Sequence, residues 1–354
     1  MIKDKTILIK NIYYMLAYAY QSLRQENYKE IAVEKFDNIH DLLTVILIKG
    51  ISLQLKQGLY RAYVGRQENL MMLRGKINII GSIKNKIMRK QSLSCNYDLL
   101  SENNVLNQIL KTTALLLLKS TNVKNKYKND LRKELLFFNN ISTVEVKSIK
   151  WQNLKFERNN KNYQMLLGVC QLIIDGLLFT TDNGKYKLRS LIDEQRMCHL
   201  YEKFLLEYYK KHYPKISVSA AQIPWVLDDG VNFMLPKMQS DITLRKGDIA
   251  LIIDAKYYSH TMQVNFDKKT IISYNLYQIF TYVKNYAYSF DDKNAKVSGM
   301  LLYAKTDEDI FPDNVYQMHG NQITVKTLDL NRDFNEIKAT LNHIVESHFI
   351  CNTL

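Results

Sequence analysis

Hydrophobic residues recur at helical spacing through the first two thirds of the chain, which predicts a mainly helical N-terminal domain. The expected helices are Asn11 to Leu23, Asp41 to Leu55, Asn103 to Leu118, Tyr163 to Phe179 and Arg196 to Tyr209. Between the second and third of these, Leu59 to Ile83 has the composition of strands, with a turn at Arg74-Gly75-Lys76. We therefore expect a small β element inside the helical domain.

The last third of the chain has a different order of apolar runs, which predicts layers of helices and strands. We expect helices at Asp193 to His212, Ile272 to Tyr288 and Asn331 to His348, strands at Ile216 to Pro224, Val297 to Ala304 and Gln322 to Leu328, and a hairpin from Met238 to Tyr257. A polar stretch with an Asn-Gly pair, Thr180 to Arg189, precedes these elements and indicates a domain boundary. The expected fold is α/β (α+β), with domains 1–188 and 189–354.

The hairpin carries the most informative residues. Its second strand, Ile249 to Ile253, is fully apolar, as expected of a strand buried on both faces, and it ends in Asp254 and Lys256. Because strand side chains alternate in direction, these two project from the same face. If Gly247-Asp248 is a two-residue turn, antiparallel pairing places Asp241 opposite Asp254. Two carboxylates and one ammonium group are then expected to converge.

This combination suits metal-dependent cleavage of a phosphodiester bond. Paired carboxylates repel each other and therefore recruit a hard divalent cation with oxygen ligands, usually Mg²⁺. We expect Asp241, Asp254 and the carbonyl oxygen of Ala255 to bind the metal, and Lys256 to orient the water or stabilise the transition-state charge. The alternative is a surface hairpin with an ordinary salt bridge, which is common and contributes little energy. The fully apolar strand argues against that alternative.

The hairpin resembles the PD-(D/E)xK nuclease superfamily, with Asp241, twelve intervening residues and then Asp254-Ala255-Lys256. The resemblance implies a restriction-endonuclease-like α/β domain. It also implies a helical acidic ligand at Glu202, and a QxxxY element at Gln278 and Tyr282. The alternatives are an ordinary exposed charge for Glu202 and simple packing for the other two. Ser240 stands where the superfamily usually has its proline.

Several segments extend this resemblance to the McrC family, the nuclease subunits of McrBC-type modification-dependent restriction systems. They are IKNIYYMLAYAY near the N-terminus, RGKI at Arg74 to Ile77, LYEKFL, and IIDAKYY followed by NLYQIFTY. The resemblance implies Mg²⁺-dependent cutting of methylated or otherwise modified DNA, in a hetero-oligomeric complex with an AAA+ GTPase of the McrB type that the subunit stimulates. It also implies that domain 1–188 docks on this partner, with Glu30 to Asn38 as the inserted segment. The chain has no GxxxxGK[ST] loop, so nucleotide hydrolysis is expected from another polypeptide.

Composition fits this interpretation without proving it. The chain has 49 Lys and Arg against 35 Asp and Glu, a net charge of +14 that suits a polyanion such as double-stranded DNA. Lys84 to Lys90 and Lys119 to Lys133 are either solvated loops or phosphate-contacting patches. The four cysteines are far apart, which argues against a zinc ribbon or a disulfide framework and favours the cytoplasm. No apolar run reaches the length that spans a bilayer, so we expect no membrane association.

Two other functions are compatible with parts of the sequence. A stand-alone repair or recombination nuclease would carry the same Asp241, Asp254 and Lys256, but the N-terminal segments argue against it. A non-catalytic adaptor of an AAA+ ring could retain the nuclease fold as a scaffold. The intact acidic and basic residues of the hairpin argue against that second alternative.

Overall fold

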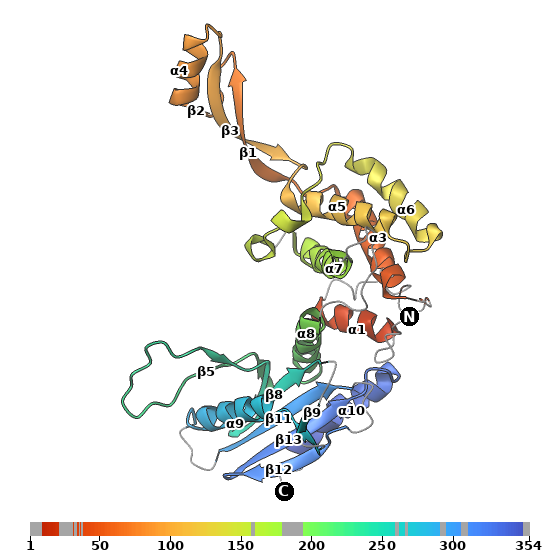
Figure 1. Ribbon diagram of the computed structural model, residues 1–354, viewed down its shortest axis with the longest axis vertical. Coiled ribbons are helices and arrows are strands. Elements are labelled where there is room, and N and C mark those ends of the chain that lie inside the picture. Colours follow the sequence, from red (N-terminus) through yellow and green to blue (C-terminus); the bar gives the residue numbers. More distant parts are fainter. Residues whose placement is uncertain are drawn as a thin grey trace. The chain divides into compact units, whose positions relative to one another are not determined.

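The computed structural model describes residues 9–20, 31, 34, 36, 38–156, 160–178, 194–258, 262–265, 268–290, 295–305 and 311–349. They form a mixed fold of helices and strands, as expected (Figure 1). The chain divides into two compact units. Unit 1 comprises residues 1–37 and 188–354, and unit 2 comprises residues 38–187. Among the described residues, no helix combines the length and the apolar character needed to cross a lipid bilayer.

Unit 1 is built on a mixed six-stranded sheet with the strand order β12-β13-β11-β8-β7-β4. Its strands are β4 (Ser217–Ser219), β7 (Ile242–Lys246), β8 (Ile249–Lys256), β11 (Lys296–Ala304), β12 (Asn314–Met318) and β13 (Asn321–Leu328). The strands β8, β11 and β13 are parallel to one another, whereas β7 pairs antiparallel with β8. Two-stranded pairs are formed by β5 (Gln222–Ile223) with β6 (Met238–Gln239) and by β9 (Met262–Asn265) with β10 (Lys268–Ile271).

Helices cover this sheet and fix the strand that carries the candidate site. The helix α8 (Glu194–His212) contacts β4, β7 and β8, and α9 (Ser273–Ala287) contacts β8, β11 and β13. Ala250 and Ile252 of β8 belong to the core under α9. A Cβ atom at Gly299 of β11 would lie 2.8 Å from side-chain atoms of Ile279 and Val283, so this glycine permits the close approach of α9. By side-chain alternation, the α9 face is also the face from which Asp254 projects.

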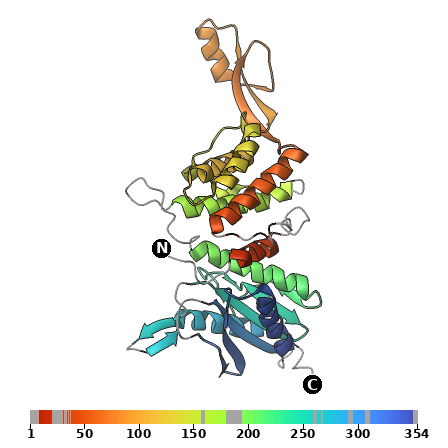
Figure 2. The same cartoon turned by 90° about the vertical axis from the view of Figure 1, so that its right-hand side faces the viewer.

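The first helix of the chain, α1 (Ile9–Ala19), packs within unit 1. Figure 2 shows it alongside α8. The Tyr14 ring stacks on Phe334, which begins α10 (Phe334–Phe349), with ring centroids 4.2 Å apart. The buried Asn11 amide donates hydrogen bonds to the carbonyl oxygens of Leu330 and Arg332, at 2.7 and 2.8 Å. The two ends of the chain therefore build one unit.

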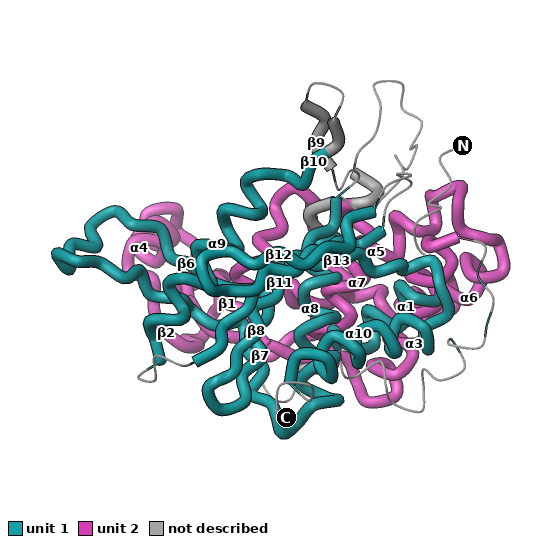
Figure 3. The backbone as a smooth tube through the Cα atoms, turned by 90° about the horizontal axis from the view of Figure 1, so that it is seen from below, with its two compact units in different colours: residues 1–37, 188–354 teal, residues 38–187 magenta. Residues whose placement is uncertain are grey.

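This arrangement differs from the domain division expected from the sequence, in which residues 1–188 formed one domain. The second boundary lies close to the expected one, but residues 1–37 belong with 188–354 (Figure 3). The difference arises because α1 buries an aromatic face, and that face is matched by α8 and α10. The polar stretch Thr180 to Arg189 lies outside the described residues. Most of Glu30 to Asn38 lies outside them as well.

Unit 2 is a helical bundle with a projecting β element. Its helices are α3 (Ile39–Gln57), α5 (Val105–Lys119), α6 (Asn125–Leu135) and α7 (Lys161–Leu178), with short 3-10 turns η3 (Leu136–Phe138), η4 (Val146–Ser148) and η5 (Trp151–Asn153). The strands β1 (Ala62–Leu70), β2 (Lys76–Ile77) and β3 (Leu93–Ser101) form an antiparallel sheet in the order β1-β3-β2. With α4 (Ile79–Ile87), residues 62–101 make up what we call the arm, the orange element that stands out from the bundle in Figure 1.

Two expectations for unit 2 were wrong in detail. Residues after Lys76 continue as a strand only to Ile77, because Asn78 caps a helix by accepting a hydrogen bond from the Gly81 amide. Half of the Lys84 to Lys90 stretch therefore belongs to a helix. The Lys119 to Lys133 stretch likewise contains α6, whose Tyr127 and Leu131 are buried. In the sequence, the many lysines around Tyr127 and Leu131 obscured the helical spacing of these apolar residues.

Candidate functional site

The hairpin β7–β8 brings the two expected aspartates together. Ile242 pairs with Ile253 and Lys246 pairs with Ile249, which confirms the expected register and its two-residue turn. Gly247 in that turn has a φ of +60°, a conformation that favours glycine. The same register, continued by one residue, sets Asp241 opposite Asp254. The Asp241 carboxylate accepts a hydrogen bond of 2.8 Å from the Ala255 amide at the end of β8.

Asp254 and Lys256 form a buried ion pair at the end of the strand. Asp254 is 1% exposed and Lys256 is 8% exposed, and the distance between Asp254 Oδ2 and Lys256 Nζ is 2.8 Å. Apart from this ion pair, no further donor among the described residues meets this buried oxygen. An exposed salt bridge on a surface hairpin, the alternative from the sequence, does not describe these residues.

Burial sets the electrostatics of this pair of carboxylates. Burial, with added repulsion from the charges of Asp254 and Glu202, raises the pKa of Asp241 to about 8. Burial also raises the pKa of Asp254, although the Lys256 ammonium opposes this shift. For Lys256, burial alone would lower the pKa, but the Asp254 carboxylate raises it above its ordinary value. The site thus holds more acidic groups than its single lysine can neutralise.

Gln278 and Tyr282 of α9 extend the site beyond the strand. Lys256 Nζ donates to Gln278 Oε1 at 3.1 Å, and Gln278 Nε2 donates to the Tyr282 hydroxyl at 3.0 Å. The two α9 residues are four positions apart and so lie on one helix face. A continuous polar chain therefore runs from Asp254 through Lys256 to the helix. It holds the ammonium group between a carboxylate and an amide oxygen.

Glu202 of α8 lies near enough for its charge to raise the pKa of both Asp241 and Asp254. One of its oxygens accepts a hydrogen bond of 3.1 Å from Cys198 Sγ, and the other lies 3.6 Å from His199 Nδ1. The contact between the Cys198 thiol and Glu202 was not predicted from the sequence. Its spacing of four residues from Glu202 on one helix could have indicated the contact. Burial and the Glu202 carboxylate raise the pKa of Cys198 to about 12, so the thiol stays neutral.

The donor set suits a hard cation that keeps part of its water shell. Among the described residues, no group of three or more His, Cys, Asp or Glu side chains could by itself hold a metal ion. The end of β8 offers instead two carboxylates, one of them with a buried oxygen whose partner is the Lys256 ammonium, beside main-chain oxygens. Mg²⁺ is commonly held by one or two carboxylates with several waters, whereas zinc sites prefer nitrogen and sulfur ligands. The residues present therefore fit Mg²⁺.

The two tyrosines after Lys256 have different surroundings. Tyr257 is 8% exposed, and its ring centroid lies 6.4 Å from that of Tyr201 on α8. Tyr257 is therefore a packing residue beneath the site. Tyr258 is half-buried, and burial raises its pKa while the nearby Lys256 charge opposes the shift. Tyr258 thus borders the opening of the site.

The arm of unit 2 forms a second candidate surface, because it exposes many large apolar side chains. These are Tyr63, Met71, Met72, Leu73, Ile77, Ile79, Ile80, Ile83, Ile87, Met88 and Leu100. Met71 and Ile80 are 89% and 83% exposed. The arm also contains seven Lys and Arg residues against two Asp and Glu. Contiguous apolar surface of this kind marks interaction sites in folded proteins.

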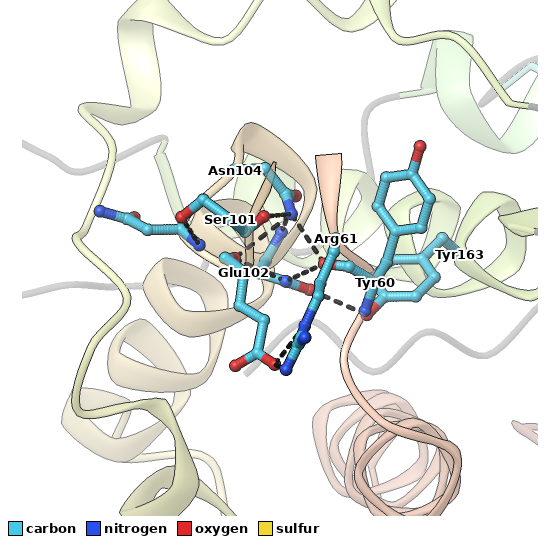
Figure 4. Close-up of polar contacts among 8 residues, drawn as sticks. Tyr60, Arg61, Ser101, Glu102, Asn104 and Tyr163 are labelled. Carbon is cyan, nitrogen blue, oxygen red and sulfur yellow. Dashed lines mark hydrogen bonds and ion pairs between the residues drawn. The ribbon is translucent and has the colours of Figure 1, made fainter. Parts of the chain in front are cut away.

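A buried polar network fixes the root of the arm (Figure 4). The Tyr163 hydroxyl of α7 donates to Asn107 Oδ1 at 2.8 Å and accepts a hydrogen bond of 2.9 Å from the Tyr60 amide. Asn107 and Asn104 of α5 both donate to the Tyr60 carbonyl oxygen, at 2.9 and 2.8 Å. The segment before β1 and the end of β3 are therefore both held to the helical bundle.

Comparison with known proteins gives consistent results. A family model described as "McrBC 5-methylcytosine restriction system component" matches residues 3–304. The "Type IV methyl-directed restriction enzyme EcoKMcrBC" of Escherichia coli K12 is 26% identical over 352 residues, which is 98% of this chain and 99% of that protein.

Two solved structures are also similar, both from Thermococcus gammatolerans. One is a half-complex from a tetradecameric assembly of McrB AAA+ hexamers with bound McrC, at a TM-score of 0.46 and 16% identity over 93% of this chain and 76% of that one. The other is the McrBC complex, at a TM-score of 0.41 and 19% identity over 59% of this chain and 60% of that one.

Proposed function

The chain belongs to the family of McrBC 5-methylcytosine restriction system components, and we propose that it is the DNA-cutting subunit of such a system. The observation that carries this proposal is the convergence of Asp241, Asp254 and Lys256 at the end of a buried strand. Phosphodiester hydrolysis requires an activated water and a positive charge beside the phosphate oxygens. A pair of carboxylates that recruits a divalent cation, next to a lysine, meets both requirements.

In this proposal, Mg²⁺ is held by Asp241, Asp254 and the Ala255 carbonyl oxygen, with water completing its shell. When bound, the cation supplies positive charge that offsets the repulsion between the carboxylates and the charge that builds on the phosphate. The raised pKa of Asp241 supports this role, because the two carboxylates oppose each other's ionisation until a cation is present. Glu202 adds a third acidic group at the same opening.

Lys256 acts on the phosphate in this proposal. Its pKa is raised by Asp254, so the side chain remains an ammonium group at all physiological pH values. The Gln278 amide oxygen accepts one of its protons and thereby limits the directions in which the others point. Gln278 and Tyr282 are then positioning residues, and Lys256 is the group that stabilises negative charge on the substrate.

We also propose that the chain works with an AAA+ GTPase of the McrB type and that it stimulates GTP hydrolysis by that partner. One of the similar structures contains McrB AAA+ hexamers with bound McrC. The present chain contains no GxxxxGK[ST] phosphate-binding loop of its own. A partner is therefore needed for any step driven by nucleotide hydrolysis. The proposed substrate is double-stranded DNA with modified cytosine.

Unit 2 supplies the docking surface in this proposal, and the arm is its best candidate. The apolar side chains of α4, Ile79, Ile80, Ile83 and Ile87, cover no core and are more than half exposed. Lys84 and Lys86 lie on the same helix. A partner surface that fits them is apolar at its centre and acidic around it.

A cleavage assay with the full chain, the GTPase partner, GTP, Mg²⁺ and methylated duplex DNA tests the nuclease assignment. The variant Asp254→Ala removes one metal ligand and should lower the cleavage rate by about a thousandfold or more. The matched control is Asp248→Ala, an exposed aspartate in the turn at the opposite end of the same hairpin. It should cut DNA at the normal rate. Normal Mg²⁺-dependent cutting by Asp254→Ala would overturn the assignment.

Calorimetric titration with Mg²⁺ separates the two roles at the end of β8. Asp254→Ala should lose metal binding, whereas Lys256→Ala should keep it and still fail to cut. Equal loss of metal affinity in both variants would contradict the separate role of the lysine. Full activity of the wild-type chain without any partner would instead identify a stand-alone nuclease.

A further inference from the structure

The loop between β5 and β6, residues 224–237, exposes several apolar side chains next to the candidate site. Val231 is 63% exposed, Phe233 79% and Met234 86%. Figure 1 shows this loop, which we call the apolar loop, standing out from unit 1 beside α9. A polar side chain would suit such an exposed position equally well, unless the side chain there contacts a ligand in the working complex. Their presence therefore calls for a ligand.

The apolar loop has a defined conformation. The Trp225 ring nitrogen donates a hydrogen bond of 2.7 Å to the Pro236 carbonyl oxygen, which ties the outgoing and returning segments together. Close to the exposed residues, the Leu235 amide donates to the Asn232 carbonyl oxygen at 3.2 Å. Met234 within this turn has a φ of +63°, a conformation that costs a residue with a side chain about 1 kcal/mol. The loop thus presents its apolar side chains in a fixed arrangement.

The root of the loop is joined to the catalytic residues through both the chain and α9. The strand β6 ends at Gln239, two residues before Asp241. On the other side, the Val226 amide donates to Asn285 Oδ1 of α9 at 2.8 Å. Asn285 is seven residues beyond Gln278, the partner of the catalytic lysine, which corresponds to about 10 Å along the helix axis. That distance equals roughly three base-pair steps of duplex DNA.

The burial of the site limits which DNA conformations could reach it. Asp254 is 1% exposed and Lys256 is 8% exposed, so a phosphate on a straight, undistorted duplex has little access to them. Proteins that bend or open DNA commonly insert Phe, Leu, Ile or Met between base steps and unstack them. A loop with roughly seven residues on each side reaches up to about 20 Å, which exceeds the depth of either groove. Reach and chemistry therefore both fit a DNA groove.

We propose that the apolar loop is a DNA wedge, in which Phe233 and Met234 enter the duplex a few base pairs from the scissile phosphate. This inference rests on the proposed nuclease function. The loop contributes apolar contact and not phosphate neutralisation, since its charged residues include the acidic pair Asp228 and Asp229. The Asp229 carboxylate accepts a hydrogen bond of 3.0 Å from the Val231 amide. The wedge thereby favours the bent backbone that brings a phosphate to Lys256.

The test uses the full chain with its GTPase partner and a methylated duplex in which adenines near the cleavage site are replaced by 2-aminopurine. Unstacking of this base raises its fluorescence. Binding is measured with EDTA, which prevents cutting, and cleavage is then measured with Mg²⁺. The variant is Phe233→Ser with Met234→Ser. The matched control is Val315→Ser, at a residue 58% exposed on β12, an edge strand of the six-stranded sheet of the same unit.

The wedge variant should lose the fluorescence rise and bind DNA roughly tenfold or more weakly, in line with the loss of a base-stacking contact. Cleavage should fall with it, and Val315→Ser should behave as wild type. Unchanged fluorescence and DNA affinity in the wedge variant, while the wild type cuts, would overturn the wedge and leave the nuclease assignment intact. A fall in self-association or partner binding at unchanged DNA affinity would also overturn it. A wild-type chain that unstacks but never cuts DNA would overturn the nuclease assignment alone.

Discussion

At the end of β8 the chain buries charge, with Asp254 only 1% exposed, whereas on the arm it exposes hydrocarbon, with Ile80 83% exposed. Each arrangement disfavours the isolated folded chain, because buried carboxylates lose hydration and exposed isoleucines order water around them. In the proposed function, each would be relieved by a ligand of opposite character, a cation in the first case and an apolar surface in the second. Departures from ordinary burial thus underlie both proposed binding sites.

The largest expected effect separates the two regions by mutation. Asp241→Ala should lower DNA cleavage by about a thousandfold or more, because the site loses a metal ligand. The same variant should still stimulate GTP hydrolysis by the partner, since the arm is untouched. Parallel assays of GTP turnover and DNA cleavage check this expectation. Loss of stimulation by a variant that still binds the partner would show that the two regions are not independent.

The converse change should affect both activities. Replacing Ile80 and Ile83 of the arm by serine removes two exposed apolar contacts, which we expect to weaken partner binding by about tenfold to a hundredfold. GTPase stimulation and cleavage should fall together, while the melting temperature stays within a few degrees. Val315→Ser, which removes an exposed apolar side chain from unit 1, serves as the control. Normal partner affinity in the arm variant would remove the arm from the docking surface.

A smaller effect should appear in the pH dependence of metal binding. The pKa of Asp241 is raised to about 8 in the metal-free protein, so its carboxyl group is mostly protonated below that pH. Mg²⁺ must displace this proton, and its affinity should rise up to about tenfold per pH unit towards pH 8 and then level off. Calorimetry at three pH values measures this. Asp241→Asn should abolish the pH dependence, and an unchanged dependence would contradict the assignment.

The same shift has a consequence for stability that can be checked without metal. The folded-state pKa of Asp241 lies above its unfolded value, so the metal-free folded chain holds a proton on this carboxyl group more tightly than the unfolded chain does. The bound proton therefore contributes to the stability of the fold. This contribution is lost as the pH rises from about 4 to about 8, so the metal-free protein should become less stable over that window. Added Mg²⁺ should reverse the trend, which thermal unfolding curves would reveal.

The smallest expected effect concerns a buried polar group that the chain itself satisfies. Tyr163→Phe removes two hydrogen bonds at the root of the arm and leaves Asn107 and the Tyr60 amide each short of a partner. We expect a loss of about 1–3 kcal/mol in unfolding free energy. The control is Tyr97→Phe, which removes an exposed hydrogen bond to Glu68 and should change stability by less than about 0.5 kcal/mol. Equal effects would show that the root network is not stabilising.

The sequence predicted the hairpin β7–β8 well because its pattern is local. A fully apolar run, a Gly-Asp turn and a fixed alternation determine the register, and Ile242 does pair with Ile253. The sequence singled out Gln278 and Tyr282 by their resemblance to a QxxxY element, but it did not predict the hydrogen bond from Lys256 to Gln278. The Cys198 contact to Glu202 was missed, although the spacing of four residues on one helix could have indicated it.

The sequence predicted the arm poorly, and the reason is physical. Ile79, Ile80 and Ile83 suggest a buried strand, because apolar residues are ordinarily interpreted as core. In the structure they lie on an exposed helix face and do not belong to the core of the chain. Contact with a partner protein would account for them. The position of α1 was likewise unpredictable, because its partners are distant in the sequence: His212 lies 194 positions beyond Tyr18, and Leu330 lies 319 positions beyond Asn11.

The joining of both chain ends in unit 1 also bears on the order of events during synthesis. Unit 2 is a continuous segment, residues 38–187, and can fold as soon as it leaves the ribosome. The helix α1 must wait, because Asn11 finds its hydrogen-bonding partners only when residues 330 and 332 have been made. At typical elongation rates this delay is tens of seconds. If the proposed roles are correct, the nascent chain acquires its docking unit before its cutting unit, which would limit the time in which an active site without its partner is exposed to the cell's own DNA.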